Sequence, residues 1–351
     1  MRGPDLDSCG VPLYEDTTRL PPPGEGRDAE DVEAQQAREA IRRRLFPSQA
    51  RELVIGRYTV DRRLGAGGMG VVFAAHDPEL EREVALKLLH PEPGHEQGNA
   101  TRLLREARAM AKLSHPNVVA VFDVGQHGDR VFVAMELVSG RSLDRWLVER
   151  ERSWLEVLEV FVQAARGLAA AHRAGLVHRD FKPENVLVGE DRRVRVGDFG
   201  LAREHDAELL VTAENTDVRD LAVTRTGAVV GTPAYMSPEQ FDGGPLDARS
   251  DQFSFCVALW EALFQRRPFA GRNVRALQRA VMEGEVQPPP TTDAPPRVVA
   301  ALRRGLSVDP EARFLDMEAL VAELAPPERR PVLGWAVGGA GLLLAGVAVT
   351  T

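Results

Sequence analysis

Three polar side chains that could do chemistry lie close together near the middle of the chain. Asp180 and Asn185 belong to the run His178-Arg179-Asp180-Phe181-Lys182-Pro183-Glu184-Asn185, and Asp198 begins the run Asp198-Phe199-Gly200. A carboxylate can orient an attacking hydroxyl, while carboxylate and amide oxygens can hold Mg²⁺ across the phosphates of a nucleotide. The residue types and their spacing therefore predict phosphoryl transfer, with Asp180 as the base and with Asn185 and Asp198 as metal ligands.

The segment between these two runs indicates how they are brought together. Val186-Leu187-Val188 and Val194-Arg195-Val196 are typical of two short strands, and Gly189-Glu190-Asp191 is typical of the turn that joins them. Such a hairpin returns Asp198 to the side of Asn185. The alternative is a polar loop followed by an ordinary hairpin. It does not explain why so many positions of both runs match a known catalytic motif.

Both runs resemble the catalytic loop and the magnesium-binding turn of the eukaryotic-type, or Hanks-type, serine/threonine protein kinases of bacteria. The resemblance implies an α+β fold with two lobes: a small lobe built on a five-stranded antiparallel sheet with one main helix, and a larger, mainly helical lobe. It also implies transfer of the γ-phosphate of ATP, bound with Mg²⁺, to serine or threonine hydroxyls of protein substrates. Lys182 matches the catalytic lysine of the serine/threonine branch, and Arg179 matches the arginine of kinases that are activated by phosphorylation of a loop.

A glycine-rich stretch lies near the start of the region that this resemblance covers. Residues 58–64 are typical of a strand, and the glycines after it let backbone amides approach phosphates without interference from side chains. A second strand follows, whereas a dinucleotide-binding loop would be followed by a helix; a plain hairpin is the alternative. Val72 would cover the adenine. The resemblance implies nucleotide contacts at Leu64, Gly65, Ala66, Gly67, Gly68, Met69, Gly70, Val72 and Ala85.

Lys87 ends the apolar strand Val84-Ala85-Leu86-Lys87, where the kinases that the chain resembles place the lysine that binds the α- and β-phosphates. A solvent-facing lysine is the alternative. Residues 101–113 are typical of a helix whose Glu106 matches the glutamate that orients this lysine, although Glu106 could instead form surface pairs with nearby arginines. Residues 118–125 and 130–137 are typical of two more strands. The adenine is expected to be bordered at their end by Met135, Glu136 and Val138.

The large lobe is expected to be built on two long helices. Ser153 and Glu156 form a capping box at the start of the first helix, which is expected to end at Gly175. Ser250-Asp251 is expected to cap the second helix, 252–264, which is apolar on nearly every face and should therefore be buried. The resemblance implies that Asp251 holds the backbone of the catalytic loop. Later helices are expected at 274–282 and 297–306.

The segment from Asp198 to Glu239 resembles an activation segment. The resemblance implies a buried ion pair between Glu239 and Arg313 that anchors the end of this segment. Residues 204–219 are polar without periodicity, so we expect the segment to be mobile. A phosphate bound to Arg179 is expected to order it. Autophosphorylation would involve transient self-association of two copies of the chain. The expected regulatory positions are Arg179, Thr224, Thr226 and Thr232.

The composition is that of a folded chain with an acidic surface. Hydrophobic residues make up 44% and charged residues 27% of the 351 residues, a length that suits one large two-lobed domain. The formal net charge of -8 argues against nucleic acid as a partner. The two cysteines, Cys9 and Cys256, provide neither a disulfide framework nor a metal-ligand spacing, which is typical of a reducing cytoplasmic setting.

The two ends of the chain differ from the region between them. Residues 1–56 begin polar and rich in proline, which predicts a disordered tail with one helix at 29–46. We expect the kinase-like domain at 57–325 and a linker at 326–331. Residues 332–351 carry no charge, which predicts a single membrane-spanning helix, and Arg329 and Arg330 would keep the domain on the cytoplasmic face of the cell membrane. A buried or unstructured tail on a cytoplasmic enzyme is the alternative.

Two other functions fit parts of the sequence. A pseudokinase scaffold would bind nucleotide and partners without turnover, but Lys87, Asp180, Asn185 and Asp198 are all present. A small-molecule phosphotransferase could share the fold, but residues 231–239 resemble the end of an activation segment that forms a platform for peptides. We therefore expect a non-specific serine/threonine protein kinase.

Overall fold

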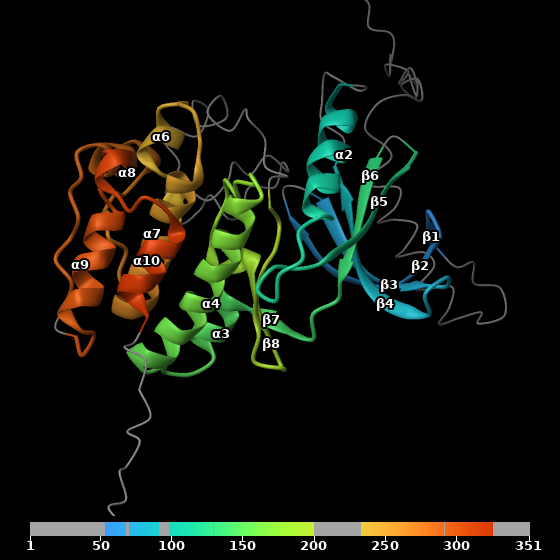
Figure 1. Ribbon diagram of the computed structural model, residues 1–351, viewed down its shortest axis with the longest axis horizontal. Helices are drawn as coiled ribbons and strands as arrows, with labels where there is room; N and C mark the ends of the chain where they lie inside the picture. The colour runs from blue at the N-terminus through green and yellow to red at the C-terminus, as the bar shows by residue number, and fades with distance from the viewer. Residues whose placement is uncertain are drawn as a thin grey trace, which may run out of the picture.

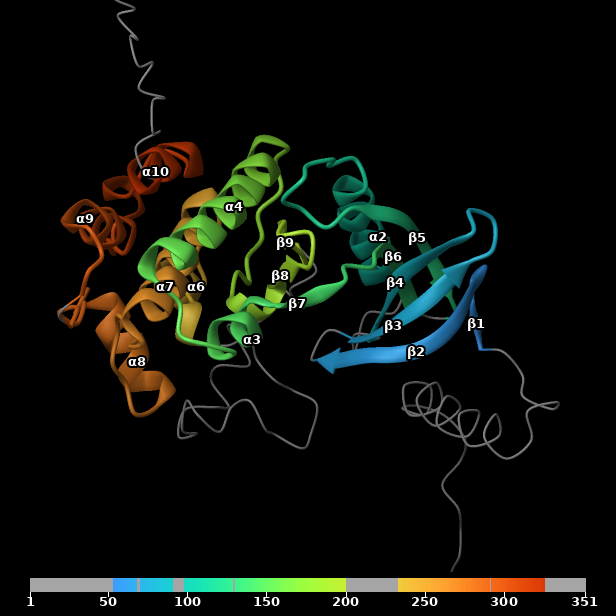
Figure 2. The same cartoon turned by 90° about the horizontal axis from the view of Figure 1, so that it is seen from below.

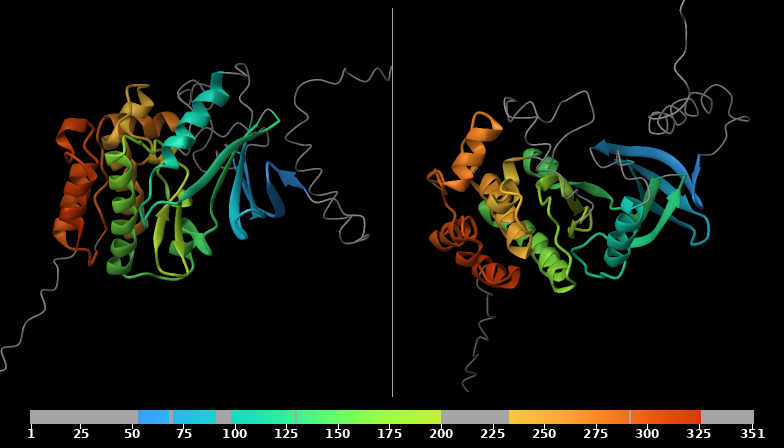
Figure 3. Two further views of the ribbon diagram at one scale, coloured as in Figure 1. Left: turned by 45° about the vertical axis from the view of Figure 1, so that its right-hand side comes forward. Right: turned by 90° about the horizontal axis from the view of Figure 1, so that it is seen from above.

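The computed structural model describes residues 53–325 except 68–69, 91–97, 129, 200–232 and 291, and it describes only the backbone of 98–103. Within these residues the chain folds into two lobes, a sheet with one helix and a helical lobe, which lie side by side (Figure 1, Figure 3). Several predictions fall outside the described residues: the N-terminal helix, Gly68 and Met69, the apolar C-terminal run, and Thr224, Thr226 and Thr232.

The small lobe is one antiparallel sheet with the strand order β1-β2-β3-β4-β6-β5. The sequence predicts five strands, and the structure adds a sixth, the two-residue β1, at the edge. Because Ile55 in β1 is fully buried in the core of this lobe, the lobe begins before the predicted boundary at residue 57. The strands are β1 (Val54–Ile55), β2 (Tyr58–Gly67), β3 (Gly70–Asp77), β4 (Arg82–Leu89), β5 (Val121–His127) and β6 (Arg130–Glu136).

The alternation of side chains along β4 explains the direction of Lys87. Val84, Leu86 and Leu88 are buried in the core cluster of the small lobe. Successive side chains of a strand point to opposite faces of the sheet, so Ala85 and Lys87 point to the other face. The main helix, α2 (Gly98–Met110), packs against β5 and β6 and begins and ends earlier than the predicted 101–113.

The large lobe is centred on α4 (Trp154–Arg173) and α7 (Ala248–Phe264), which pack against each other. The predicted capping box of α4 is confirmed, because Ser153 and Glu156 each accept a hydrogen bond from the backbone N–H of the other. The predicted cap of α7 is wrong. Its N-cap is Asp247, which forms a capping box with Ser250 and leaves the carboxylate of Asp251 available for other contacts.

Shorter helices complete the large lobe around this pair (Figure 1). The predicted bounds 274–282 are confirmed, and the helix predicted at 297–306 begins and ends one residue earlier. No helix in the described part of the chain is both long and apolar enough to cross a membrane. These helices are α3 (Leu143–Val148), α6 (Pro238–Phe241), α8 (Val274–Met282), α9 (Pro296–Gly305) and α10 (Met317–Leu324).

A second, three-stranded sheet lies between the helical lobe and the small lobe (Figure 2). Its strands are β7 (Gly140–Ser142), β8 (Val186–Gly189) and β9 (Val194–Val196). The predicted hairpin is confirmed, because β8 pairs with β9, whereas β7 was not predicted. Asn185 immediately precedes β8 and Asp198 closely follows β9, so this small sheet positions both predicted metal ligands.

Candidate active site

The backbone of the catalytic loop is held by the side chain of Asp251, in the first turn of α7. Asp251 Oδ2 accepts the backbone N–H of His178 at 2.7 Å, and Oδ1 accepts the backbone N–H of Arg179 at 2.8 Å. His172 Nε2 lies 2.7 Å from the same Oδ2. A carboxylate that is only 1% exposed needs such donors. The geometry therefore agrees with the role that the sequence implies for Asp251.

Arg179 has a left-handed backbone, with φ at 67°, which is strained for a residue that carries a Cβ. Side chains hold both of its backbone groups: Asp251 binds the N–H, and Gln240 Nε2 donates to the carbonyl oxygen at 2.7 Å. Gln240 is fixed in turn by a capping box with Ser237 at the start of α6. Sequence reasoning missed Gln240, although the spacing of Ser237 and Gln240 is a capping-box signal.

Asp180, Lys182 and Asn185, the three residues that are predicted to be catalytic, form a compact polar network. Lys182 Nζ donates to Asp180 Oδ2 at 2.8 Å. Asn185 Nδ2 donates to the backbone oxygen of Asp180 at 2.8 Å and to Oδ2 at 3.3 Å. Both side chains bind the same carboxylate oxygen, so the second oxygen, Oδ1, can accept a hydrogen bond from an approaching hydroxyl.

The turn that carries Asp198 is fixed on both sides. The backbone N–H of Gly197 donates to the oxygen of Asn185 at 2.9 Å, which confirms that the hairpin returns the chain to Asn185. Phe199 is 1% exposed, and its ring lies 4.7 Å from the ring of His178, measured between centroids. Asp198 itself has φ at 59°. A strained backbone at this point persists because the surrounding contacts determine it.

Lys87 and Asp198 bring the two lobes together at the site. Lys87 Nζ lies 2.8 Å from Asp198 Oδ1, and the lysine side chain is 4% exposed. Burial acts to raise the pKa of Asp198, but the charge and hydrogen bond of Lys87 outweigh burial and lower it. The carboxylate of Asp198 is therefore held in its ionised form, the form that a metal ion binds.

Glu106, which is predicted to orient Lys87, lies beside Arg179 of the catalytic loop. Glu106 Oε1 is 3.8 Å from Arg179 Nη1, whereas the ion pair described for Lys87 is with Asp198. The placement of α2 brings Glu106 to the arginine of the catalytic loop, while the turn after β9 brings Asp198 to the lysine. The role of Glu106 in orienting Lys87 stays a prediction.

Four predicted nucleotide contacts share one face of the small-lobe sheet. Val72 pairs with Lys87, and Ala85 pairs with Met135. Residues directly opposite each other on neighbouring strands share a face, as do alternate residues of one strand. The structure therefore brings together Val72, Ala85, Lys87 and Met135.

The glycine loop connects β2 to β3. At Gly65 and Gly67 an added Cβ would meet no protein atom within 4 Å, so packing within the described chain does not require glycine there. A ligand that approaches the backbone closely would require glycine at these two positions. Gly70 differs, because its φ is 151° and an added Cβ would lie 2.2 Å from the Leu88 oxygen. The loop thus combines one structural glycine with two that suit a phosphate-binding backbone.

Asn185, which precedes β8, and Asp198, which follows β9, suit a divalent cation that is bound together with a nucleotide. Asn185 uses its amide nitrogen for the bonds to Asp180, which leaves its amide oxygen as the ligand atom, and Asp198 offers an ionised carboxylate. Mg²⁺ typically takes one or two protein ligands of this kind and completes its shell with phosphate and water oxygens. The donor set therefore fits the predicted metal.

The predicted ion pair between Glu239 and Arg313 is confirmed. The arginine side chain is fully buried, and its Nη1 and Nη2 donate to the two carboxylate oxygens of Glu239 at 2.8 and 2.9 Å. Backbone oxygens of Ser307, Val308 and Arg249 accept its remaining hydrogen bonds. A fully satisfied buried pair of this kind fixes the end of the activation segment to the large lobe.

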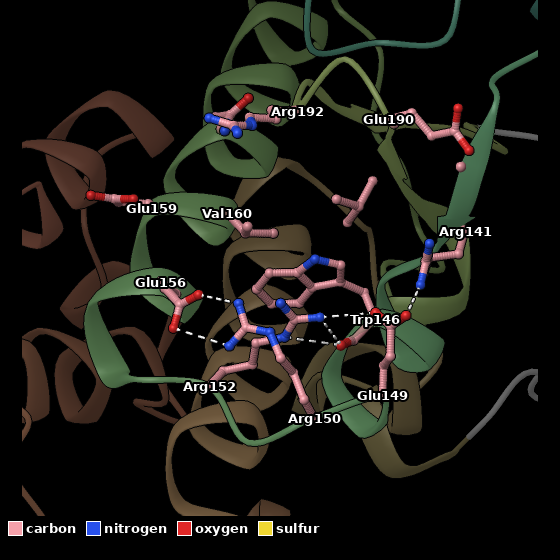
Figure 4. Close-up of a pocket in the computed structure, with 14 residues that line it drawn as sticks. Arg141, Trp146, Glu149, Arg150, Arg152, Glu156, Glu159, Val160, Glu190 and Arg192 are labelled. Atoms are coloured by element: carbon pink, nitrogen blue, oxygen red, sulfur yellow. Dashed lines mark hydrogen bonds and ion pairs between the residues drawn. The ribbon is translucent and has the colours of Figure 1, made fainter.

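A groove of about 780 Å³ lies elsewhere on the large lobe, between α3, the start of α4 and the β8–β9 turn (Figure 4). Several of its charged side chains bind one another: Arg150 pairs with Glu156, and Arg152 pairs with Glu149. Arg152 also stacks on the ring of Trp146, 3.8 Å from its centroid. None of the predicted site residues lines this groove.

Residues 58–323 match the model of the protein kinase domain, and the chain belongs to the protein kinase family. It is 36% identical over 291 residues to the serine/threonine-protein kinase PknL of Mycobacterium tuberculosis, an alignment that covers 79% of this chain and 69% of that protein. It is 38% identical over 283 residues to the serine/threonine-protein kinase pkn3 of Myxococcus xanthus, which covers 76% of this chain and 49% of that protein.

A solved structure supports the same fold. The crystal structure of the Mycobacterium tuberculosis PknI kinase domain matches with a TM-score of 0.60 and 26% identity, over 79% of this chain and 98% of that domain. The chain is therefore a serine/threonine protein kinase with the two-lobed kinase fold. Membership of this family implies ATP, protein substrates and a divalent metal ion.

Proposed function

We propose that Asp180 is the base with which this kinase transfers the γ-phosphoryl group of ATP, bound with Mg²⁺, to serine and threonine hydroxyls. The observation that carries the proposal is the network in which Lys182 and Asn185 hold one oxygen of Asp180 and leave the other for the substrate. Asp180 would orient the hydroxyl and take its proton as the oxygen attacks the γ-phosphorus and ADP leaves. Positioning and electrostatics supply most of the rate in such a transfer.

Charged side chains around Asp180 would stabilise the transferring group. Lys182, 2.8 Å from Asp180, is placed to contact the γ-phosphate, and Lys87 would bind the α- and β-phosphates in place of Asp198. Asp198 and Asn185 would hold Mg²⁺, which when bound neutralises charge on the phosphates. The adenine would lie against the sheet face that carries Val72, and the backbone of residues 136–138 would bind its edge.

The direct test is transfer from ATP labelled at the γ-phosphorus to a mixture of protein acceptors, with Mg²⁺ and with a chelator in its place. Acid hydrolysis of the labelled products should give phosphoserine and phosphothreonine and no phosphotyrosine. Label found solely on small molecules would favour a small-molecule phosphotransferase instead. Nucleotide binding with no transfer under any condition would favour a pseudokinase.

We propose further that phosphorylation of Thr224 or Thr226, with Thr232 as a third position, switches the enzyme on. The support is the position of Arg179. Its side chain is 29% exposed, so a phosphate can reach it, and its Nη1 lies 3.8 Å from Glu106 Oε1. A phosphate adds nearly two negative charges and three acceptor oxygens, which an arginine binds by charge-assisted hydrogen bonds. The modification would be made by a second copy of the chain during transient self-association.

We propose that residues 332–351 anchor the enzyme to the cell membrane with its catalytic domain in the cytoplasm. The support is the uncharged sequence of this run, together with the arginines at 329 and 330 on the side of the domain. The last described helix of the large lobe, α10, ends at Leu324, so only a short connection separates the domain from this run. A cytoplasmic enzyme with a free tail is the alternative.

A further inference from the structure

The side chain of Arg195 joins the two lobes through a contact that the proposed chemistry does not use. Arg195 lies in β9 and is 8% exposed, and its Nε is 2.9 Å from Glu136 Oε1. Glu136 is the last residue of β6 and begins the hinge, which we define as residues 136–140. On its other side the guanidinium binds Asp191 in the β8–β9 turn, with Nη1 at 3.1 Å from Oδ1 and Nη2 at 2.8 Å from Oδ2. One cation therefore holds a carboxylate from each lobe.

Backbone hydrogen bonds also join β9 and the end of β6, through a third segment of the chain. The N–H of Val196 donates to the oxygen of Asn117, and the N–H of Val119 donates to the oxygen of Val196, both at 2.9 Å. Ala120, the next residue of that segment, accepts the N–H of Glu136 at 2.8 Å. The end of β6 and β9 are thus bound to the same short segment, 117–120. Arg195 adds a direct side-chain link between them.

The two parts that Arg195 links lie at opposite ends of the proposed nucleotide site. β6 leads into the hinge, whose backbone is proposed to bind the adenine, and β9 leads to Asp198, which is proposed to hold the metal at the phosphates. Their relative position sets the length of the site. We infer that Arg195 is a positioning residue that fixes the hinge relative to the metal-binding turn. This inference rests on the proposed function and adds to it a determinant of nucleotide affinity.

The physical consequence concerns binding more than the chemical step. When the hinge is already held at the correct distance, the nucleotide meets a preformed site, whereas a loosened hinge has to be ordered at the expense of binding free energy. Asp180, Lys182 and Asn185 do not contact Arg195 in the described structure, so the transfer step itself should be little affected. Loss of the link should therefore raise KM for ATP and leave kcat nearly unchanged.

The test compares Glu136→Gln with Asp191→Asn in the full chain. Each variant removes one carboxylate from Arg195, but only Glu136→Gln breaks a link between the lobes. Glu136→Gln and Arg195→Met should each raise KM for ATP about fivefold to tenfold with kcat within about twofold, while Asp191→Asn should keep both constants within about twofold. Arg195→Lys, which keeps the charge, should restore part of the affinity.

A double variant separates this contact from independent effects. Arg195→Met/Glu136→Gln should have the same KM as Arg195→Met alone, because both residues act through one interaction. Additive effects, or equal effects of Glu136→Gln and Asp191→Asn on KM, would overturn the inference. So would a lower Tm with unchanged KM, since that result indicates a structural role alone. If Arg195→Met does not fold, the comparison of KM for ATP between Glu136→Gln and Asp191→Asn tests the inference on its own. The proposed function is tested separately, because it fails only if Asp180→Asn transfers phosphate normally.

Discussion

Lys87 Nζ lies 2.8 Å from Asp198 Oδ1, so a strand of the small lobe and a turn of the large lobe meet in one ion pair at the active site. A lysine side chain that is 4% exposed needs a counter-charge, because an unpaired buried cation is costly. The phosphates of a nucleotide carry the same kind of charge. We therefore expect them to compete with Asp198 for the lysine, which would link nucleotide binding to the relative position of the lobes.

This relationship predicts that Lys87→Met retains the fold but loses catalysis. Methionine keeps the apolar stem, while the charge that is proposed to bind the phosphates is removed. We expect kcat/KM for ATP to fall by about a hundredfold or more, since charge stabilisation supplies much of the rate in phosphoryl transfer. Lys112→Met, at an exposed position, is the matched control and should behave as the parent. A Lys87→Met enzyme with near-parental kcat/KM would contradict the assignment.

The pair of Glu239 and Arg313 predicts a stability effect. Glu239→Gln keeps the shape of the side chain but leaves the buried guanidinium without its counter-charge, which costs about 3–5 kcal/mol. The Tm at pH 7 should therefore fall by several degrees. Glu311→Gln is the matched control, because Glu311 pairs with Arg249 at the surface and is 77% exposed, so its loss should barely change Tm. Thermal unfolding of the three proteins measures the difference.

The same pair predicts how this difference depends on pH. Burial acts to raise the pKa of Glu239, but the hydrogen bonds and charge of Arg313 outweigh it and lower the pKa. A carboxyl with a lowered pKa in the folded state stabilises the protein above its unfolded pKa, about 4.3, and this contribution is lost as pH falls through the folded value. The Tm gap between parent and Glu239→Gln should be full at pH 7 and shrink below about pH 4. A constant gap would contradict the ion pair.

Sequence alone predicted that the proposed catalytic residues lie close together, because they are confined to two short runs. Asp180, Lys182 and Asn185 bind one another within one loop, and the hairpin that returns Asp198 is encoded by local strand and turn residues. The capping box of α4 is equally local, since Ser153 and Glu156 bind each other's backbone. Such features depend on neighbours in the chain and can therefore be predicted from it.

The features that were missed depend on tertiary contacts. Three polar residues, Asp247, Ser250 and Asp251, could cap α7, and the choice is settled by the catalytic loop, which occupies the carboxylate of Asp251. The contact between Glu106 and Arg179 depends on where α2 lies relative to the large lobe, which no local pattern encodes. Likewise β1 exists because Ile55 is buried in the small-lobe core.

The proposed switch predicts a requirement for the activation-segment threonines. Protein incubated with ATP and Mg²⁺ should carry phosphate on Thr224 or Thr226, and Thr224→Ala/Thr226→Ala should lose about nine-tenths or more of the activity toward an added substrate. The matched control is Thr212→Ala/Thr216→Ala, which alters the same segment and should keep activity. Mass spectrometry and initial rates measure both effects. Parental activity in the first double variant would exclude control by these residues.

The proposed anchor predicts a difference between the full chain and a chain that ends at residue 326. The full chain should sediment with membranes and resist carbonate extraction, because an uncharged run of this length partitions into the bilayer. The shortened chain should be soluble and keep its kcat, since the described kinase domain ends at residue 325. Fractionation of cells that express each form measures this. A full chain found in the soluble fraction would leave the kinase assignment intact and remove the anchor.

The central claim is that Asp180 is the base, and the most direct test is single-turnover phosphoryl transfer by Asp180→Asn. Asparagine has nearly the same shape but cannot accept the proton, so the rate should fall by about 10²–10⁴ while the affinity for ATP changes little. The amide of Asn185 can still bind the backbone oxygen of residue 180, which preserves the loop. A single-turnover rate close to that of the parent would contradict the account.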